Sequence, residues 1–132
     1  MRARSNEYLV DTDVLIEHLT FNSRTKESYL ELLMQNGICF STVLNASELL
    51  FMAESHLEQD MIAELLSSLK ILGLHSRYSL LVPKYQSRVK NSNEALMCVV
   101  ADYNKLPIIT LKKNKYIRSG LMVYHPAELN LK

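Results

Sequence analysis

The segment Tyr8-Leu9-Val10-Asp11-Thr12-Asp13 decides the fold, because it is a short apolar run that ends in two carboxylates. A second apolar run, Ile38-Cys39-Phe40, precedes a segment that carries Glu48, and Glu94 begins the apolar stretch 95–101. Acids that follow buried strands can converge at one edge of a parallel sheet, where their charges repel unless a cation or protons neutralise them. The pattern therefore suggests a divalent metal site.

Length and composition predict one globular domain that spans residues 1–132. Hydrophobic residues make up 48% of the chain and charged residues 22%, so the chain can bury a core and is not expected to be disordered. The formal net charge is +1, so overall charge identifies no partner. Any nucleic-acid binding has to come from local basic patches.

Short apolar runs alternate with longer helical patterns, which favours an α/β fold with a parallel sheet. The segment 76–90 has a helical pattern interrupted by Pro83, which predicts a kink or a helix that starts late. The predicted strands are 8–10, 38–41, 70–74, 107–110 and 121–124, and the predicted helices are 15–19, 25–35, 46–55, 57–68 and 94–104.

The cysteines and the N-terminal segment indicate a cytoplasmic protein. Cys39 and Cys98 both lie in apolar runs, which is typical of buried free thiols, although a disulfide in a secreted protein is an alternative. Residues 1–7 carry charges and no apolar core, so we expect no export signal. No apolar run approaches the roughly 20 residues that span a bilayer.

Each acid has a structural alternative to metal binding. Asp11 could cap the following helix, although Asp13 lies closer to that helix and is the better candidate for the cap. Glu48 and Glu94 could be surface carboxylates in the first turns of their helices, where the helix dipole favours them. Asp102 is rotated by about 80° from Glu94 around the helix, so we expect it at the surface.

Basic residues follow Thr110 and suggest a rim that contacts phosphates, although a solvated loop is an equal alternative. The four histidines show no ligand spacing, and we expect Tyr116 to pack in the interior. The residues of this predicted basic rim are Lys112, Lys113, Lys115 and Arg118 together with Asn114, and Lys84, Arg88 and Lys90 could extend it.

Three motifs together resemble those of PIN-domain proteins, especially VapC-type toxins. Tyr8 to Ile16 resembles the first motif of this family, and Phe40 to Leu49 resembles the second, in which a Glu follows a Ser at a strand end. Glu94 to Thr110, followed by Tyr116, resembles the third motif and the last strand. The resemblance covers nearly the whole chain and rests on the order and spacing of the motifs.

This resemblance implies a three-layer α/β/α sandwich with a central parallel sheet. It also implies a cytoplasmic ribonuclease that uses Mg²⁺ or Mn²⁺, often forms a homodimer and is neutralised by an antitoxin. Asp11, Glu48 and Glu94 would hold the metal, which activates a water for attack on phosphorus. Asp13 and Thr110 would support them, and Asp11→Asn is expected to abolish cleavage and leave folding intact.

Two departures from the family pattern leave a second interpretation open. The family usually has Asp where this chain has Glu94, and Asp or Asn where it has Lys112. The Lys112 ammonium could replace a metal charge or pair with Asp11, and Asn114 could substitute in part although its register differs. The alternative is a degenerate PIN domain that binds RNA or a protein partner without cutting.

A third interpretation is a phosphatase of the haloacid dehalogenase type. Asp11-Thr12-Asp13-Val14 also fits the opening of that family, with Asp11 as the nucleophile and Asp13 as the acid or base. However, the segment 108–110 leads into lysines, where paired acids should hold Mg²⁺. That interpretation also leaves Glu48 and Glu94 without a role.

Overall fold

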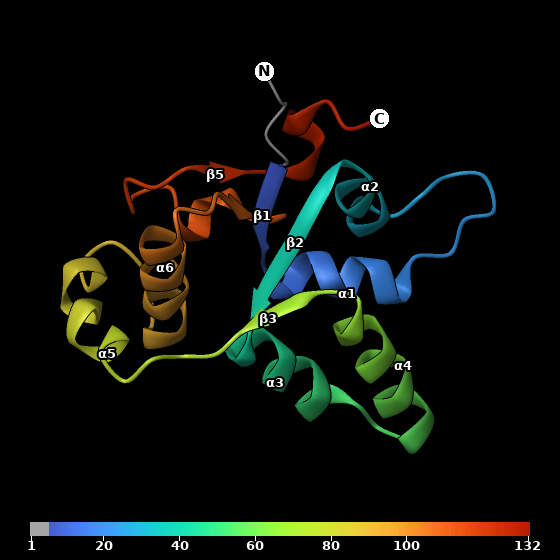
Figure 1. Ribbon diagram of the computed structural model, residues 1–132, viewed down its shortest axis with the longest axis horizontal. Helices are drawn as coiled ribbons and strands as arrows, with labels where there is room; N and C mark the ends of the chain where they lie inside the picture. The colour runs from blue at the N-terminus through green and yellow to red at the C-terminus, as the bar shows by residue number, and fades with distance from the viewer. Residues whose placement is uncertain (1–5) are drawn as a thin grey trace.

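A parallel sheet forms the centre of the protein in a computed structural model, which describes residues 6–132 (Figure 1). Its five strands lie in the order β3-β2-β1-β4-β5, and every neighbouring pair is parallel. The order reverses at β1, so the carboxyl ends of β1 and β4 meet at the switch point where open α/β sheets bind ligands. The strands are β1 Asn6–Val10, β2 Gly37–Thr42, β3 Lys70–Leu72, β4 Ile108–Ile109 and β5 Val123–Tyr124.

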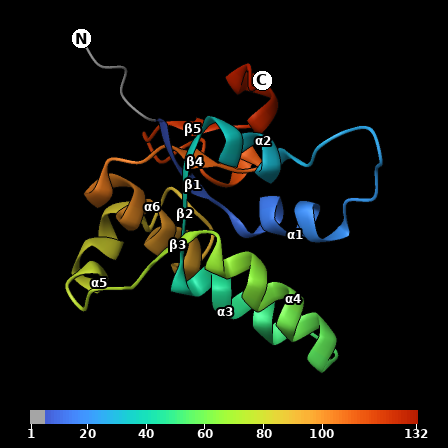
Figure 2. The ribbon, with the colours of Figure 1, turned by 45° about the vertical axis from the view of Figure 1, so that its right-hand side comes forward.

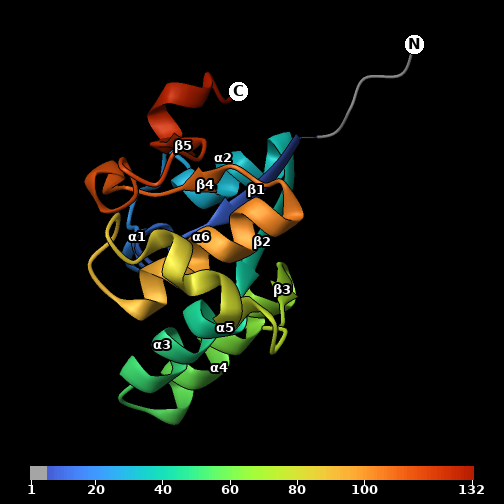
Figure 3. The ribbon, with the colours of Figure 1, turned by 90° about the vertical axis from the view of Figure 1, so that its left-hand side faces the viewer.

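Helices cover both faces of the sheet, which confirms the three-layer α/β/α prediction (Figures 1 and 3). The α-helices are α1 Thr12–Thr20, α2 Tyr29–Asn36, α3 Val43–Met52, α4 His56–Ser67, α5 Tyr78–Leu81 and α6 Ser92–Asn104. Short 3₁₀ helices occupy Val82–Tyr85, Lys113–Lys115 and Pro126–Leu129.

The two halves of the core lie on opposite faces of β1, because successive side chains of a strand point to opposite sides. Tyr8 and Val10 pack with apolar residues of α1, α2 and α4, whereas Leu9 packs with α6. Cys39 belongs to the first cluster and Cys98 to the second, and both are buried and free. Their placement confirms the predicted buried thiols and explains why they do not pair.

Capping residues decide where three helices begin, and each start differs from the sequence prediction. Helix α2 begins at Tyr29 because Ser28 forms a capping box with Glu31. Thr42 caps α3, and Asn45, three residues later, completes the capping box. Asn91 caps α6 through its side-chain oxygen, so the helix begins at Ser92, ahead of the predicted start.

The segment 76–90 forms the short α5 and a 3₁₀ helix that contains Pro83, in line with the predicted interruption. Helices α3 and α4 form a hairpin that extends away from the sheet (Figure 2).

Within residues 6–132, no helix combines the length and apolar character that a membrane span requires. Of the N-terminal segment in which we expected no export signal, residues 1–5 lie outside the described residues.

Candidate functional site

Asp11 lies directly after β1 and is 3% exposed. Its Oδ1 accepts a hydrogen bond of 2.9 Å from the backbone N–H of Thr12 and so caps α1. Its Oδ2 accepts from the Lys115 ammonium at 2.8 Å, from the Thr110 hydroxyl at 3.1 Å and from the Tyr116 hydroxyl at 3.2 Å. Four donors therefore fix this carboxylate, and one of them carries a full positive charge.

Asp13 does not cap α1, contrary to the sequence prediction, because the helix starts immediately after Asp11 and places Asp13 in its first turn. Its Oδ2 accepts from the Thr110 hydroxyl at 3.0 Å and from the backbone N–H of Leu111 at 3.1 Å. Its Oδ1 is buried and has no hydrogen-bond partner among the described residues. Burial and the neighbouring charge of Asp11 raise the pKa of Asp13.

The structure brings Asp11, Glu48 and Glu94 to the walls of one pocket of about 200 Å³. Glu48 is exposed on α3, whereas Glu94 is partly buried in the first turn of α6 and accepts from the backbone N–H of Lys90 at 3.1 Å. The three carboxylates surround the pocket without meeting at one point. Within residues 6–132, no three His, Cys, Asp or Glu side chains lie close enough to hold a metal ion together.

The cation that pairs with Asp11 is Lys115, so the expected pairing of Lys112 with Asp11 was wrong. Lys112 is exposed and reaches the site through its backbone N–H, which donates to the Thr110 hydroxyl at 3.2 Å. The 3₁₀ turn Lys113–Lys115 reverses the chain and brings the side chain of Lys115 back over Asp11. Burial lowers the pKa of Lys115, but the hydrogen bond and charge of Asp11 outweigh it and raise this pKa overall.

Asn45, whose side-chain amide is buried, belongs to the site and was not predicted from the sequence. The Asn45 side chain donates to the Thr12 hydroxyl at 2.8 Å and accepts from the Thr42 hydroxyl at 2.6 Å. These bonds tie the start of α3 to the start of α1, and so fix the helix that carries Glu48 against the loop that carries Asp11. The sequence signal that could have identified this residue is the position of Asn45 three residues after Thr42, which is the spacing of a capping box.

The donor set of the pocket fits a hard divalent cation, because carboxylate oxygens are the preferred ligands of Mg²⁺ and Mn²⁺. Asp11 lies at the base of the site, and Glu48 and Glu94 line the same pocket. Two features oppose a cation in this arrangement: the Lys115 ammonium already occupies Oδ2 of Asp11, and the three carboxylates are held apart around the pocket. These residues therefore fit a metal ion once Lys115 has moved away and the carboxylates have come closer together.

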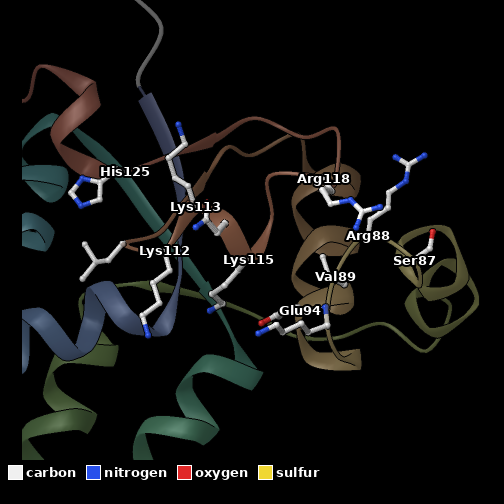
Figure 4. A pocket seen from close by; sticks show the side chains of 12 residues that line it. Ser87, Arg88, Val89, Glu94, Lys112, Lys113, Lys115, Arg118 and His125 are labelled. Carbon is white, nitrogen blue, oxygen red and sulfur yellow. Dashed lines mark hydrogen bonds between the residues drawn. The ribbon is translucent and has the colours of Figure 1, made fainter.

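A larger groove of about 990 Å³ adjoins the acidic pocket, and Glu94 and Lys115 line both (Figure 4). Figure 4 shows its basic side chains coming from the segment before α6 and from the loop after β4. The Arg88 guanidinium donates to the carbonyl oxygen of Ser119 at 3.3 Å and joins these two segments. The cationic residues that line this basic groove are Arg88, Lys90, Lys112, Lys113, Lys115 and Arg118.

Three other residues considered in the sequence lie outside the acidic pocket or serve mainly as structure. Asn114 lines the basic groove and not the acidic pocket. Asp102 is exposed and pairs with Lys84 at 3.3 Å, which confirms its predicted surface position. Tyr116 is 1% exposed and packs in the core, where burial is the main cause that raises its pKa.

Comparisons with solved structures show the same fold at low sequence identity. The structure of VapBC-1 from nontypeable Haemophilus influenzae matches with a TM-score of 0.73 and 17% identity over 92% of this chain and 98% of that chain. FitAcB from Neisseria gonorrhoeae matches with a TM-score of 0.72 and 14% identity over 92% and 99% of the two chains. VapBC2 from Rickettsia felis, bound to a promoter DNA fragment, matches with a TM-score of 0.70 and 14% identity over 90% and 98%.

The family of the protein is identified from its sequence. No curated protein matches the chain. The family model of the PIN domain matches residues 8–116, which run from β1 through the 3₁₀ turn that carries Lys115 and include all three acids of the pocket. This match spans most of the chain and agrees with the fold, and the protein therefore belongs to the PIN domain family.

Proposed function

We propose that residues 1–132 form a single PIN-like domain that hydrolyses phosphodiester bonds of RNA with Mg²⁺ or Mn²⁺. The observation that carries this proposal is the contact between an acidic pocket and a basic groove, which share Glu94 and Lys115. A divalent cation supplies a Lewis acid for the phosphate and a bound water of lowered pKa. Asp11, Glu48 and Glu94 are the residues that would hold it.

The other residues of the site position Asp11 and bind the nucleic acid. Thr110 donates its hydroxyl toward both Asp11 and Asp13, and so keeps the end of β4 against the end of β1. The cations of the basic groove neutralise backbone phosphates, which gives an affinity that depends on salt and little on base sequence. RNA that lies in this groove passes over Glu94 at the mouth of the acidic pocket.

We further propose that the protein is the toxin of a toxin–antitoxin pair, because a structural neighbour with a TM-score of 0.70 comes from a toxin–antitoxin complex of Klebsiella pneumoniae. A groove of about 480 Å³ between α1, α3 and α4 supports a protein partner. Phe51 is 92% exposed beside it, and Leu57, in its wall, is 70% exposed. Apolar surface of this kind marks interfaces, and an antitoxin segment or a second copy in a homodimer could cover it.

The test is cleavage of a mixed pool of single-stranded RNA by purified protein with Mg²⁺ or Mn²⁺, and with a chelator in their place. We expect metal-dependent cleavage that Asp11→Asn abolishes. The matched control is Asp102→Asn, since Asp102 is an exposed aspartate on α6 outside both cavities, and this variant should cleave normally. Equal cleavage by Asp11→Asn and by the unmodified protein would contradict the proposed site.

A second candidate function is RNA binding without cleavage, and the pair between Lys115 and Asp11 favours it. In that case the protein binds the RNA pool in the basic groove and leaves it intact in the presence of metal. The family match favours either PIN function over a haloacid dehalogenase, because β4 leads into lysines and not into paired acids.

A further inference from the structure

Lys115 lines the acidic pocket together with Asp11, Glu48 and Glu94, and its ammonium contacts Asp11 directly. Its ammonium is 2.8 Å from Oδ2 of Asp11, and the negative charges of Asp13 and Glu94 also act on it. Glu94, on α6, lines the same two cavities as Lys115, on the loop after β4 (Figure 4). A single positive charge thus interacts with three acids, which is the position that a bound cation takes in such a cluster.

The basic groove is a second position that is open to the Lys115 ammonium. Its side chain is 29% exposed, whereas that of Asp11 is 4% exposed, so the ammonium approaches a fixed carboxylate from the open side. Lys115 lines both cavities, and the basic groove lies directly beside it. Rotation of a flexible lysine side chain takes its charge from Asp11 into this groove without moving the backbone.

We propose that Lys115 is a built-in competitor of the divalent cation at Asp11, so that metal enters the acidic pocket only when the Lys115 ammonium withdraws from it. This inference rests on the proposed function, because it assumes that Asp11 takes part in metal binding. A metal ion bound to Oδ2 of Asp11 would meet the ammonium at contact distance, and two cations at that separation repel strongly. Either cation alone offsets part of the negative charge of the carboxylates.

The test is titration of the protein with Mn²⁺ by calorimetry, without RNA. We expect Lys115→Gln to bind Mn²⁺ about tenfold more tightly than the unmodified protein, since it lacks the competing charge. Lys115→Arg retains a cation and should bind as weakly as the unmodified protein. Lys84→Gln is the matched control, because Lys84 pairs with the exposed Asp102, and it should leave Mn²⁺ affinity unchanged.

Adding Asp11→Asn to Lys115→Gln should remove the gained affinity, which places the metal at Asp11. If Lys115→Gln and the unmodified protein bind Mn²⁺ equally and both lose it with Asp11→Asn, the competition is wrong and the proposed metal site stands. If Lys115→Gln binds no Mn²⁺, both the competition and the metal site are wrong.

A measurement on the unmodified protein does not depend on the folding of a variant. Lysine acylation followed by mass spectrometry should label Lys115 more slowly than Lys84 in a chelator, because the ammonium is held by Asp11. Saturating Mn²⁺ should raise the labelling rate of Lys115 several-fold and leave that of Lys84 unchanged. Labelling of Lys115 that is equally slow with and without bound Mn²⁺ would overturn the proposal.

Discussion

The ion pair between Asp11 and Lys115 should contribute far more to folding than the exposed pair between Lys84 and Asp102. At 2.8 Å the direct attraction amounts to about 6 kcal/mol at an effective dielectric constant of about 20. Desolvation offsets part of it, and breaking a fully buried pair costs about 3–5 kcal/mol. Because the Lys115 side chain is 29% exposed, we expect a coupling energy of about 2–3 kcal/mol.

The assay is a double-mutant cycle of urea unfolding with Lys115→Gln, Asp11→Asn and the double variant, in a chelator at neutral pH. The reference is the cycle of Lys84→Gln and Asp102→Asn, whose 3.3 Å pair is about half exposed on both sides. Such exposed pairs contribute about 0.2–1 kcal/mol. Equal coupling energies in the two cycles would refute the structural reasoning about the acidic pocket.

The sequence predicted that Asp11→Asn leaves folding intact, and the ion pair between Asp11 and Lys115 changes this expectation. Asp11→Asn should lower the unfolding free energy by itself, because it leaves the Lys115 ammonium without its counter-charge. The loss is expected in a chelator and at pH values well below the pKa of Lys115. Because this pKa is raised on folding, the contribution of Lys115 is present below its unfolded pKa and is lost as the pH rises through the folded one. Stability of Asp11→Asn equal to that of the unmodified protein would contradict this result.

Two further substitutions test other parts of the structure by urea unfolding. Asp13→Asn should raise the unfolding free energy by about 1 kcal/mol at neutral pH, because it removes a buried charge whose Oδ1 has no partner among the described residues. The pKa of Asp13 is raised on folding, so this gain should shrink as the pH falls and the native aspartate takes up a proton; a gain that grows at low pH would contradict it. Gly37→Ala should lower the unfolding free energy by about 1–3 kcal/mol, because its Cβ would overlap the carbonyl oxygen of Asn6 in β1, and an unchanged value would show that the strands can move apart.

The sheet and the three acids were predictable from the sequence because both depend on local patterns. An apolar run that ends in a polar residue, as at Val10 and Asp11, predicts a buried strand whose carboxyl end faces a ligand site. The carboxyl ends of parallel strands share one edge, so Asp11 and Glu48 had to lie near each other. This reasoning fixes which residues line the pocket and not how their side chains point.

The partner of Asp11 was not predictable, because three lysines stand within four residues and have the same chemistry. Comparison with the family pattern pointed to Lys112, whereas the 3₁₀ turn Lys113–Lys115 selects Lys115. Nothing in the composition of this loop predicts the turn. The sequence predicted only that Tyr116 packs in the interior, whereas in the structure its hydroxyl contacts Asp11 beside the Lys115 ammonium.

The position of Lys115 between two cavities has a consequence for how the protein binds its ligands. A lysine that moves from Asp11 to a phosphate in the basic groove exchanges one anionic partner for another. Bound RNA would therefore offset the loss of the ion pair between Lys115 and Asp11, which metal binding alone does not offset. If Lys115 competes with the metal, RNA should then strengthen metal binding, and metal should strengthen RNA binding by the same factor. Under the proposed function, the exchange of Lys115 between Asp11 and a phosphate would distinguish the two candidate functions, because metal-dependent cleavage requires that Lys115 releases Asp11 and RNA binding in the basic groove does not.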